Sequence, residues 1–229
     1  MVKTEPEPIR SIFVVDDHPL TRAGIRESID VHASLTLIGE SDNADDTLEK
    51  VQKLKPDLLI VDLTLRGRSG LELIKDLRKV QPEVEILVFS MHEETFYAER
   101  VLRAGARGYV MKSEGAKQLV EAIQTILKGE VHVSDLVASN FLNNLTGRKR
   151  KTSSSPVSHL TDRELEVLAL VGKARESREI AKLLSMSVKT VEAHRASIRQ
   201  KLDIKTRAEL VRFAVLWGED TKMDGITQS

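Results

Sequence analysis

The stretch SIFVVDDHPL, residues 11–20, joins a run of apolar residues to two adjacent carboxylates. Four apolar residues in succession, from Ile12 to Val15, are typical of a strand that is buried on both faces. Asp16 and Asp17 follow directly, and two like charges this close repel unless a cation or a hydrogen-bond donor lies between them. The same residues also suit a loop that opens a helix at Pro19. This stretch alone therefore leaves two alternatives open, a loop and a metal site.

Short apolar runs alternate with helical patterns along the first half of the chain. The runs are IFVV (12–15), LTLIG (35–39), LLIV (58–61), EILVFS (85–90) and GYVM (108–111). Amphipathic segments lie between them, near 20–30, 44–54, 70–80 and 96–104, with a fifth after Gly115. This alternation predicts an α/β fold, a doubly wound sheet of five parallel strands covered on both faces. Ligands of such sheets bind beyond the carboxyl ends of the strands, where Asp16 and Asp17 are expected.

The second half of the chain shows only helical patterns. TDRE (161–164) and TRAE (206–209) have the Thr-x-x-Glu form of a helix-capping box, as SGLE (69–72) has the Ser-x-x-Glu form in the first half. The pattern predicts an all-α region without strands, whose helices lie near 162–171, 177–184, 188–202 and 207–216.

Between the halves, residues 131–145 are expected to carry one short helix. TGRKRKTSSSPVS (146–158) is rich in serine and basic residues and is typical of a flexible linker. Its RKRK motif at 148–151 fits a solvated hinge, a phosphate-binding arm or a localisation signal. We therefore expect an α/β domain over 10–130, a linker over 131–157 and a small all-α domain over 158–217.

Length and composition exclude several classes of protein. The 229 residues contain no cysteine, which rules out disulfides and thiolate metal sites and fits a reducing compartment. No apolar run approaches the roughly 20 residues that span a bilayer, and the first ten residues lack the apolar core of a signal peptide. We expect a soluble cytoplasmic protein with no membrane partner.

The net charge of zero conceals an asymmetry between the halves. Residues 1–147 hold 18 Lys and Arg against 24 Asp and Glu, a net charge of −6. Residues 156–217 hold 12 basic against 8 acidic residues, a net charge of +4, and the RKRK motif adds another +4. An acidic first half and a basic second half predict two modules with different partners.

Polar residues stand at the ends of four of the expected strands. Asp16 and Asp17 follow the first strand and Asp62 follows the third, while Ser90 ends the fourth and Lys112 follows the fifth. Each alone is an ordinary strand-end residue, but one such group on four strands indicates a site. Three carboxylates can bind Mg²⁺, and a neutralised Asp62 could attack an anionic phosphoryl donor. Lys112 and Ser90 could then bind the phosphoryl oxygens.

Residues 10–130 resemble the receiver domain of bacterial two-component response regulators, a flavodoxin-like fold. The resemblance rests on the Asp pair, the central Asp, the Ser and the Lys at their strand ends. It implies that Asp62 is the phosphoacceptor, converted to 4-aspartylphosphate. It further implies that Asp17 binds Mg²⁺, that Asp16 assists directly or through water, and that the backbone carbonyl of Thr64 completes the protein ligands.

The same resemblance makes Tyr109 the switch aromatic, which acts with Ser90; the alternative is a partly buried core tyrosine. Two positions depart from the family pattern. Arg66 replaces a proline that often follows the acceptor, which puts the rigidity of that loop in doubt. Ser113 follows Lys112 where many receivers have proline.

The segment SREIAKLLSMSVKTVEAHRASIRQKL (177–202) predicts a helix, a tight turn at 185–187 and a longer helix. On a helical wheel Val188, Val191, Ile198 and Leu202 cluster within about one third of the circle, as a buried face would. The opposite face is small and polar with basic residues around it, and a helix of that shape can enter the DNA major groove. A four-helix bundle that only dimerises is the alternative.

This segment, with LTDRELEVLAL before it, resembles the LuxR-type helix-turn-helix. Together with a receiver, it resembles the NarL/FixJ subfamily over nearly the whole chain. By this resemblance four residues face the bases: Lys189, Glu192, Ala193 and Ala196. Three are better placed for the DNA backbone: Thr190, Arg195 and Arg199.

The wheel puts Arg195 near the buried edge, so its guanidinium is expected to extend outward. His194 lies nearer the core side, which favours a structural role over the alternative of a base contact. Ala174 departs from the family pattern, which usually has glycine there, and Glu176 adds a negative charge where a DNA phosphate could approach.

The sequence therefore predicts a DNA-binding transcriptional response regulator rather than an enzyme, with Mg²⁺ as its cofactor. The expected partners are a sensor histidine kinase, double-stranded DNA and a second copy of the chain, with RNA polymerase as a further candidate. Two alternatives remain, a DNA-binding regulator that acts independently of phosphorylation and a Mg²⁺-dependent phosphohydrolase.

Overall fold

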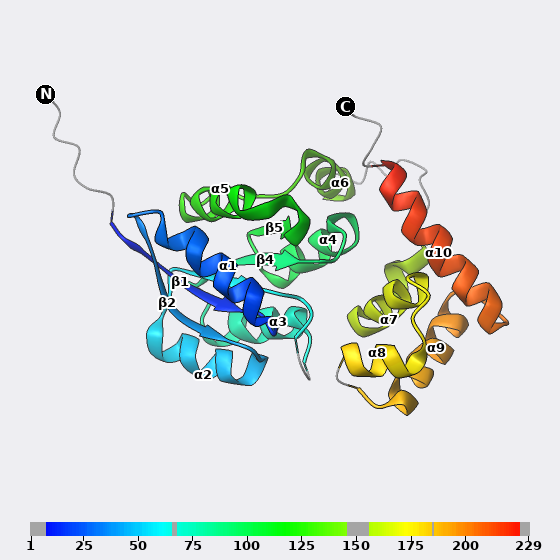
Figure 1. Ribbon diagram of the computed structural model, residues 1–229. Helices are drawn as coiled ribbons and strands as arrows, with labels where there is room; N and C mark the ends of the chain where they lie inside the picture. Colours follow the sequence, from blue (N-terminus) through cyan, green and yellow to red (C-terminus); the bar gives the residue numbers. More distant parts are fainter. Residues whose placement is uncertain (1–7, 66–67, 146–155, 185, 225–229) are drawn as a thin grey trace, which may run out of the picture. The chain divides into compact units, whose positions relative to one another are not determined.

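The computed structural model describes residues 8–65, 68–145, 156–184 and 186–224 (Figure 1). The chain forms two compact units, Met1–Leu145 and Thr146–Ser229. The RKRK motif, Arg66 and residues 146–155 of the expected linker lie outside the described residues.

The first unit is an α/β fold built on five parallel strands in the order β2-β1-β3-β4-β5. The strands are β1 (Arg10–Val15), β2 (Leu35–Ser41), β3 (Leu58–Val61), β4 (Glu85–Ser90) and β5 (Gly108–Met111). The helices are α1 (Pro19–Asp30), α2 (Ala44–Leu54), α3 (Gly70–Val80), α4 (Glu94–Ala104), α5 (Gly115–Leu127) and α6 (Asp135–Leu145), with a short 3-10 helix, η1 (Lys112–Glu114), before α5. The predicted fold class is confirmed.

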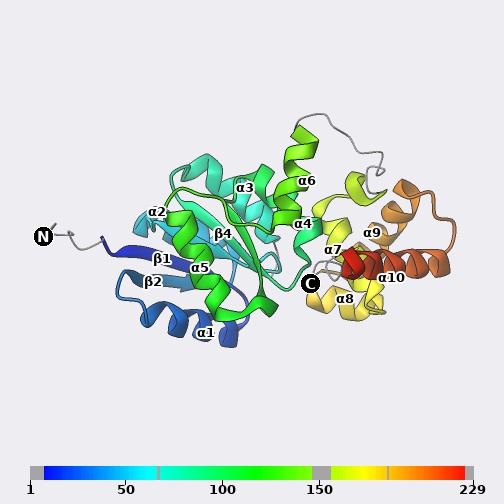
Figure 2. The same cartoon turned by 90° about the horizontal axis from the view of Figure 1, so that it is seen from above.

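Helices cover both faces of this sheet (Figures 1 and 2). Helices α1 and α5 pack together on one face, and α2, α3 and α4 follow one another on the other. The strands carry apolar side chains in both directions, because alternate residues point to opposite faces and both are covered. Ile12 and Val14 in β1 and Ile60 in β3 belong to the core shared with α1 and α5.

The segment after α5 returns to the sheet before α6 begins. His132 forms a parallel bridge with Gly108, and its carbonyl accepts a hydrogen bond of 2.9 Å from the Tyr109 amide. Helix α6, the short helix expected within 131–145, packs against α4. The first unit therefore extends to the end of α6.

The second unit is helical, and its described residues contain no strand. Its elements are η2 (Pro156–His159), α7 (Asp162–Gly172), α8 (Ser177–Leu183), α9 (Val188–Lys201) and α10 (Arg207–Asp224). The expected capping boxes are present at Thr161 with Glu164 and at Thr206 with Glu209. Helix α10 runs beyond residue 216, where the sequence pattern placed its end. Across the described helices, none combines the length and apolar character needed to cross a membrane.

Candidate functional site

The carboxyl edge of the sheet brings together the groups that the sequence placed at strand ends. Asp16 follows β1 and Asp62 follows β3, and both side chains are buried. Lys112, directly after β5, reaches between them, with its Nζ 2.7 Å from Asp16 Oδ2 and 2.6 Å from Asp62 Oδ2. Ser90, at the end of β4, is fully buried. The expected cluster forms because the carboxyl ends of parallel strands meet at one edge.

Burial and charge act against each other in this cluster. Burial raises the pKa of the Asp62 carboxyl, and although the Lys112 charge opposes this, repulsion from Asp16 adds to it. Burial alone would lower the pKa of Lys112, but the charge of Asp62 and hydrogen bonds to both carboxylates raise it overall. The lysine is therefore held as a cation between two carboxylates that would otherwise repel each other.

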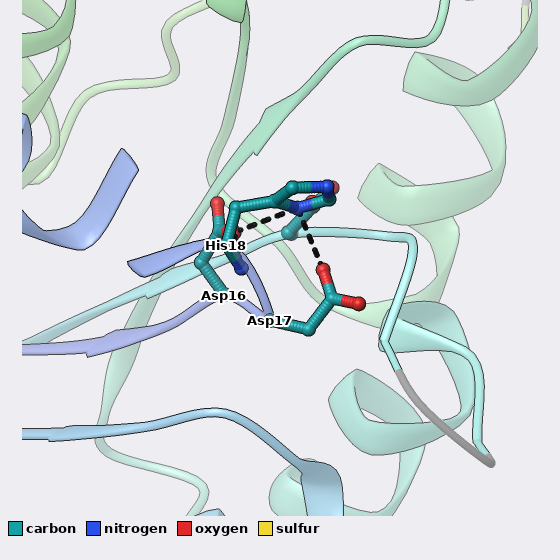
Figure 3. A group of neighbouring side chains, drawn as sticks. Asp16, Asp17 and His18 are labelled. Carbon is teal, nitrogen blue, oxygen red and sulfur yellow. Dashed lines mark hydrogen bonds and ion pairs between the residues drawn. The ribbon is translucent and has the colours of Figure 1, made fainter. Parts of the chain in front are cut away.

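Asp17 lies beside this cluster and carries a neighbour that the sequence reading did not assign to the site. His18 Nδ1 is 2.7 Å from Asp17 Oδ1 and 3.4 Å from Asp16 Oδ1. Figure 3 shows the three side chains close together, with the interactions between them dashed. Asp16, Asp17, His18 and Asp62 each offer a ligand atom, and these atoms lie within 4.8 Å of one another. The sequence signal for His18 was its position directly after the Asp pair.

The loop after β3 folds back onto Asp62. The Thr64 amide donates a hydrogen bond of 3.2 Å to Asp62 Oδ1, and the Gly70 amide donates one of 2.9 Å to the Leu63 carbonyl. A Cβ atom at Gly70 would lie 2.1 Å from the Asp62 carbonyl oxygen, so only glycine allows this close approach. The backbone at Asp62 is thus held by α3 as well as by the sheet.

Tyr109, the expected switch aromatic, points into the protein with 2% of its surface exposed. Its hydroxyl donates a hydrogen bond of 2.9 Å to the His92 carbonyl. Burial raises the pKa of Tyr109 well above its ordinary value, although a hydrogen bond with Ser90 acts in the opposite direction. Ser113, the second departure from the family pattern, lies in η1.

In the second unit, α8 and α9 form a helix-turn-helix in which α9 packs on α7 and α8. Ser187 caps α9 by accepting a hydrogen bond of 3.0 Å from the Thr190 amide. Val191 and Ile198 are fully buried as expected, but Val188 is 43% exposed, so its assignment to the buried face was wrong. A helical wheel gives the direction of a side chain but not whether a neighbour covers it at the end of a helix.

The seven residues of α9 that were assigned to DNA fall into two groups by their exposure to solvent. Four are exposed: Lys189, Thr190, Ala193 and Ala196. Three are partly buried: Glu192, Arg195 and Arg199. His194 is partly buried too, and burial lowers its pKa.

Each of the three partly buried residues has an intramolecular partner. Glu192 accepts hydrogen bonds from Ser177 Oγ (2.5 Å) and from Arg207 (2.7 Å), which connect α9 to the first turns of α8 and α10. Arg195 donates to the Arg175 carbonyl at 3.1 Å, and Arg199 donates to the Lys205 carbonyl at 3.2 Å. The expectation that Arg195 extends outward was therefore wrong, because a backbone carbonyl lies within its reach; burial also lowers its pKa.

Three further residues of this unit have structural roles. Ala174, where the family pattern has glycine, adopts a left-handed conformation with φ of 56°, and Glu176 is the N-cap residue of α8. Glu164 is 3% exposed and accepts hydrogen bonds from Ser197 (2.6 Å) and Lys201 (2.7 Å), both in α9. Sequence reasoning identified Glu164 only through its capping box, because its partners are more than thirty residues away.

Comparisons with known proteins agree with this geometry. Residues 12–124 match the response regulator receiver domain, and residues 158–214 match the luxR family of bacterial regulatory proteins. The oxygen regulatory protein NreC of Staphylococcus haemolyticus is 35% identical over 208 residues, which cover 89% of this chain and 96% of that protein. The NreC protein of Staphylococcus carnosus is 34% identical over the same shares.

Solved structures give the same result. The RcsB response regulator of Salmonella typhimurium is similar with a TM-score of 0.65 and 26% identity, over 91% of this chain and 98% of that one. RcsB bound to promoter rprA in the presence of the phosphomimetic BeF₃⁻ is similar with a TM-score of 0.60 and 25% identity, over 90% and 98% of the two chains. The chain belongs to the LuxR-type response regulators of two-component systems, DNA-binding transcription regulators of the NarL/FixJ type that are not enzymes.

Proposed function

We propose that this response regulator is switched by Mg²⁺-dependent phosphorylation of Asp62. The observation that carries the proposal is the pairing of Lys112 with both Asp16 and Asp62 at the carboxyl edge of the sheet. Two buried carboxylates and a partly buried cation lie together here. Such a charged cluster adds little stability and is typical of functional sites.

The donor atoms at this edge fit Mg²⁺. The candidate ligands are carboxylate oxygens of Asp16, Asp17 and Asp62 and the backbone carbonyl of Thr64, and hard cations such as Mg²⁺ prefer oxygen. When bound, the ion would neutralise part of the negative charge that would otherwise repel an anionic phosphoryl donor.

The transfer itself requires few groups. A carboxylate oxygen of Asp62 forms a bond to phosphorus while the bond from phosphorus to the nitrogen or oxygen of the donor breaks, and the leaving group takes the electron pair. The ammonium of Lys112 and the hydroxyl of Ser90 are candidates to bind the phosphoryl oxygens. A sensor histidine kinase or a small phosphodonor would supply the phosphoryl group.

The output is regulated DNA binding. Phosphorylation would shift the first unit between two conformations through Ser90 and Tyr109, and so alter dimerisation or the availability of α9. The exposed face of α9 is the candidate surface for the major groove of double-stranded DNA, and dimers would bind paired half-sites. The similarity to RcsB bound to promoter DNA supports this part. RNA polymerase is a further candidate partner.

Phosphorylation and DNA binding correspond to separate domains in this proposal. We propose that residues 10–130 form the phosphoacceptor domain and residues 158–217 the DNA-binding domain. Residues 131–157 would connect them, with α6 packed on the first of the two.

A phosphorylation experiment tests the proposal. The full-length protein is incubated with Mg²⁺ and a small phosphodonor, and the intact mass and acid lability of the adduct are measured. Asp62→Ala should abolish an adduct that Asp45→Ala, an exposed carboxylate in α2, leaves unchanged. An adduct that persists in Asp62→Ala and is stable in acid would contradict the assignment. Binding of both forms to genomic DNA fragments then tests whether phosphorylation controls DNA binding.

A further inference from the structure

His92 lies in the loop between β4 and α4 and contacts parts of the first unit that are distant in the sequence. Its ring Nε2 is 3.0 Å from Thr64 Oγ1, in the loop after Asp62. The same ring packs against Tyr97 of α4, with 4.7 Å between the ring centroids. The backbone of His92 accepts the hydrogen bond from the Tyr109 hydroxyl and donates one of 3.4 Å to Ser90 Oγ.

Thr64 connects His92 to the phosphorylation site in a direct way. The Thr64 amide donates to Asp62 Oδ1, and its carbonyl is a candidate Mg²⁺ ligand. Its side chain holds His92 at the same time. A change of charge at Asp62 therefore acts on Thr64, whose amide contacts Asp62 and whose side chain contacts His92.

On the other side, α4 connects to the segment that leads out of the first unit. Tyr97 is buried within α4, and Glu94, the first residue of that helix, accepts a hydrogen bond of 2.8 Å from the Ser134 amide just before α6. Arg103 near the end of α4 lies over the Phe141 ring of α6, 5.9 Å from its centroid. A movement of α4 would therefore disturb both ends of its contact with α6.

We infer that His92 is a positioning residue that couples the Thr64 loop to α4, by a route additional to the pair of Ser90 and Tyr109. The Thr64 side chain and the His92 ring form this route, and it responds to Mg²⁺ at the site as well as to phosphorylation. The inference rests on the proposed function for its input, but the contact itself exists without any ligand.

The first test uses the full-length protein without Mg²⁺ or phosphodonor and measures hydrogen–deuterium exchange of peptides from α4. Thr64→Val keeps the size and the backbone carbonyl of the residue but removes the hydroxyl, and His92→Phe keeps the ring that packs on Tyr97. Each should speed exchange in α4 by about fivefold, the change expected from losing one hydrogen bond. The double variant should exchange no faster than either single variant, and Thr64→Ser should restore the original rate.

Unchanged exchange in Thr64→Val, or additive effects in the double variant, would overturn the coupling. This test does not depend on whether the protein binds Mg²⁺ or becomes phosphorylated.

The second test adds saturating Mg²⁺, with binding measured separately by calorimetry. In the original protein Mg²⁺ should change the exchange of α4, and in His92→Phe this change should disappear although Mg²⁺ still binds. A change that persists in His92→Phe would overturn the inference. Failure of the original protein to bind Mg²⁺ would contradict the proposed metal site instead, and the comparison without ligand would still decide the coupling.

Discussion

The side-chain nitrogen of Lys112 lies 2.6 Å from Asp62 Oδ2 and 2.7 Å from Asp16 Oδ2, so one partly buried cation pairs with two acids that follow different strands. A lysine in this position does two things: it lets Asp16 and Asp62 stay together without a metal, and it leaves Asp62 next to a cation that could bind a phosphoryl group.

Lys112→Met should destabilise the protein by about 3 kcal/mol when no divalent cation is present, because it leaves two buried carboxylates unpaired. Mg²⁺ should recover much of this loss, since it would supply the missing positive charge. Urea unfolding followed by circular dichroism, with and without Mg²⁺, measures both effects. Lys53→Met, which removes only an exposed pair with Glu49, is the control and should change stability by less than about 0.5 kcal/mol. Equal losses with and without Mg²⁺ would count against a metal at this site.

Glu164 should make the second unit sensitive to acid. Its hydrogen bonds to α9 and to Thr161 overcome the effect of burial and lower its pKa from 4.5 to about 2. Because the folded pKa is below the unfolded one, the stabilisation is complete above pH 4.5 and is lost as the pH falls toward about 2. A shift of this size corresponds to about 3 kcal/mol.

Urea unfolding followed by the fluorescence of Trp217, the single tryptophan of the chain, reports on this unit at each pH. Glu164→Gln should be less stable at neutral pH, and the gap to the original protein should close in acid. Glu179→Gln, on the exposed side of α8, is the matched control. A gap that stays constant over this pH range would contradict the role of Glu164.

Ala174→Gly should stabilise the second unit by about 0.5 kcal/mol. The left-handed conformation costs an alanine about 1 kcal/mol or more, and the greater freedom of unfolded glycine offsets part of the gain. Gly172→Ala, two residues earlier, should have the opposite effect, because its Cβ atom would lie 2.6 Å from the Ala214 carbonyl oxygen. Urea unfolding followed by Trp217 fluorescence measures the stability of both variants. A loss of stability in Ala174→Gly would contradict the prediction.

Arg199→Ala and Ala193→Leu should separate two kinds of DNA contact. Arg199 is assigned to phosphates, so its loss should weaken binding to all sequences and make the slope of log K against log salt shallower by about one unit. Ala193 is exposed and assigned to the bases, so a leucine there should impair specific sites and spare non-specific binding. Fluorescence anisotropy over a salt series with specific and random duplexes distinguishes the two. The assignments fail if both variants change the salt slope equally.

The sequence determined the fold of the first unit and the placement of most of its candidate site residues. Apolar runs of strand length alternate with amphipathic segments. This alternation favours a parallel sheet with helices on both faces. Once the strands are parallel, Asp16, Asp62, Ser90 and Lys112 must gather at one edge, because each stands at the carboxyl end of its strand. The helices of the second unit followed from capping boxes and helical period, which are also local signals.

Only the tertiary structure decided which side chains contact each other across elements. Nothing near Thr64 in the sequence indicates His92, and nothing near Glu164 indicates Lys201, because those contacts depend on how loops and helices pack. The same holds for Glu192, whose assignment to the bases did not anticipate its bonds to Ser177 and Arg207. Local periodicity sets the direction of a side chain, whereas its burial and its partners depend on neighbours that packing brings from elsewhere in the chain, as the exposed Val188 and the partly buried Arg195 demonstrate.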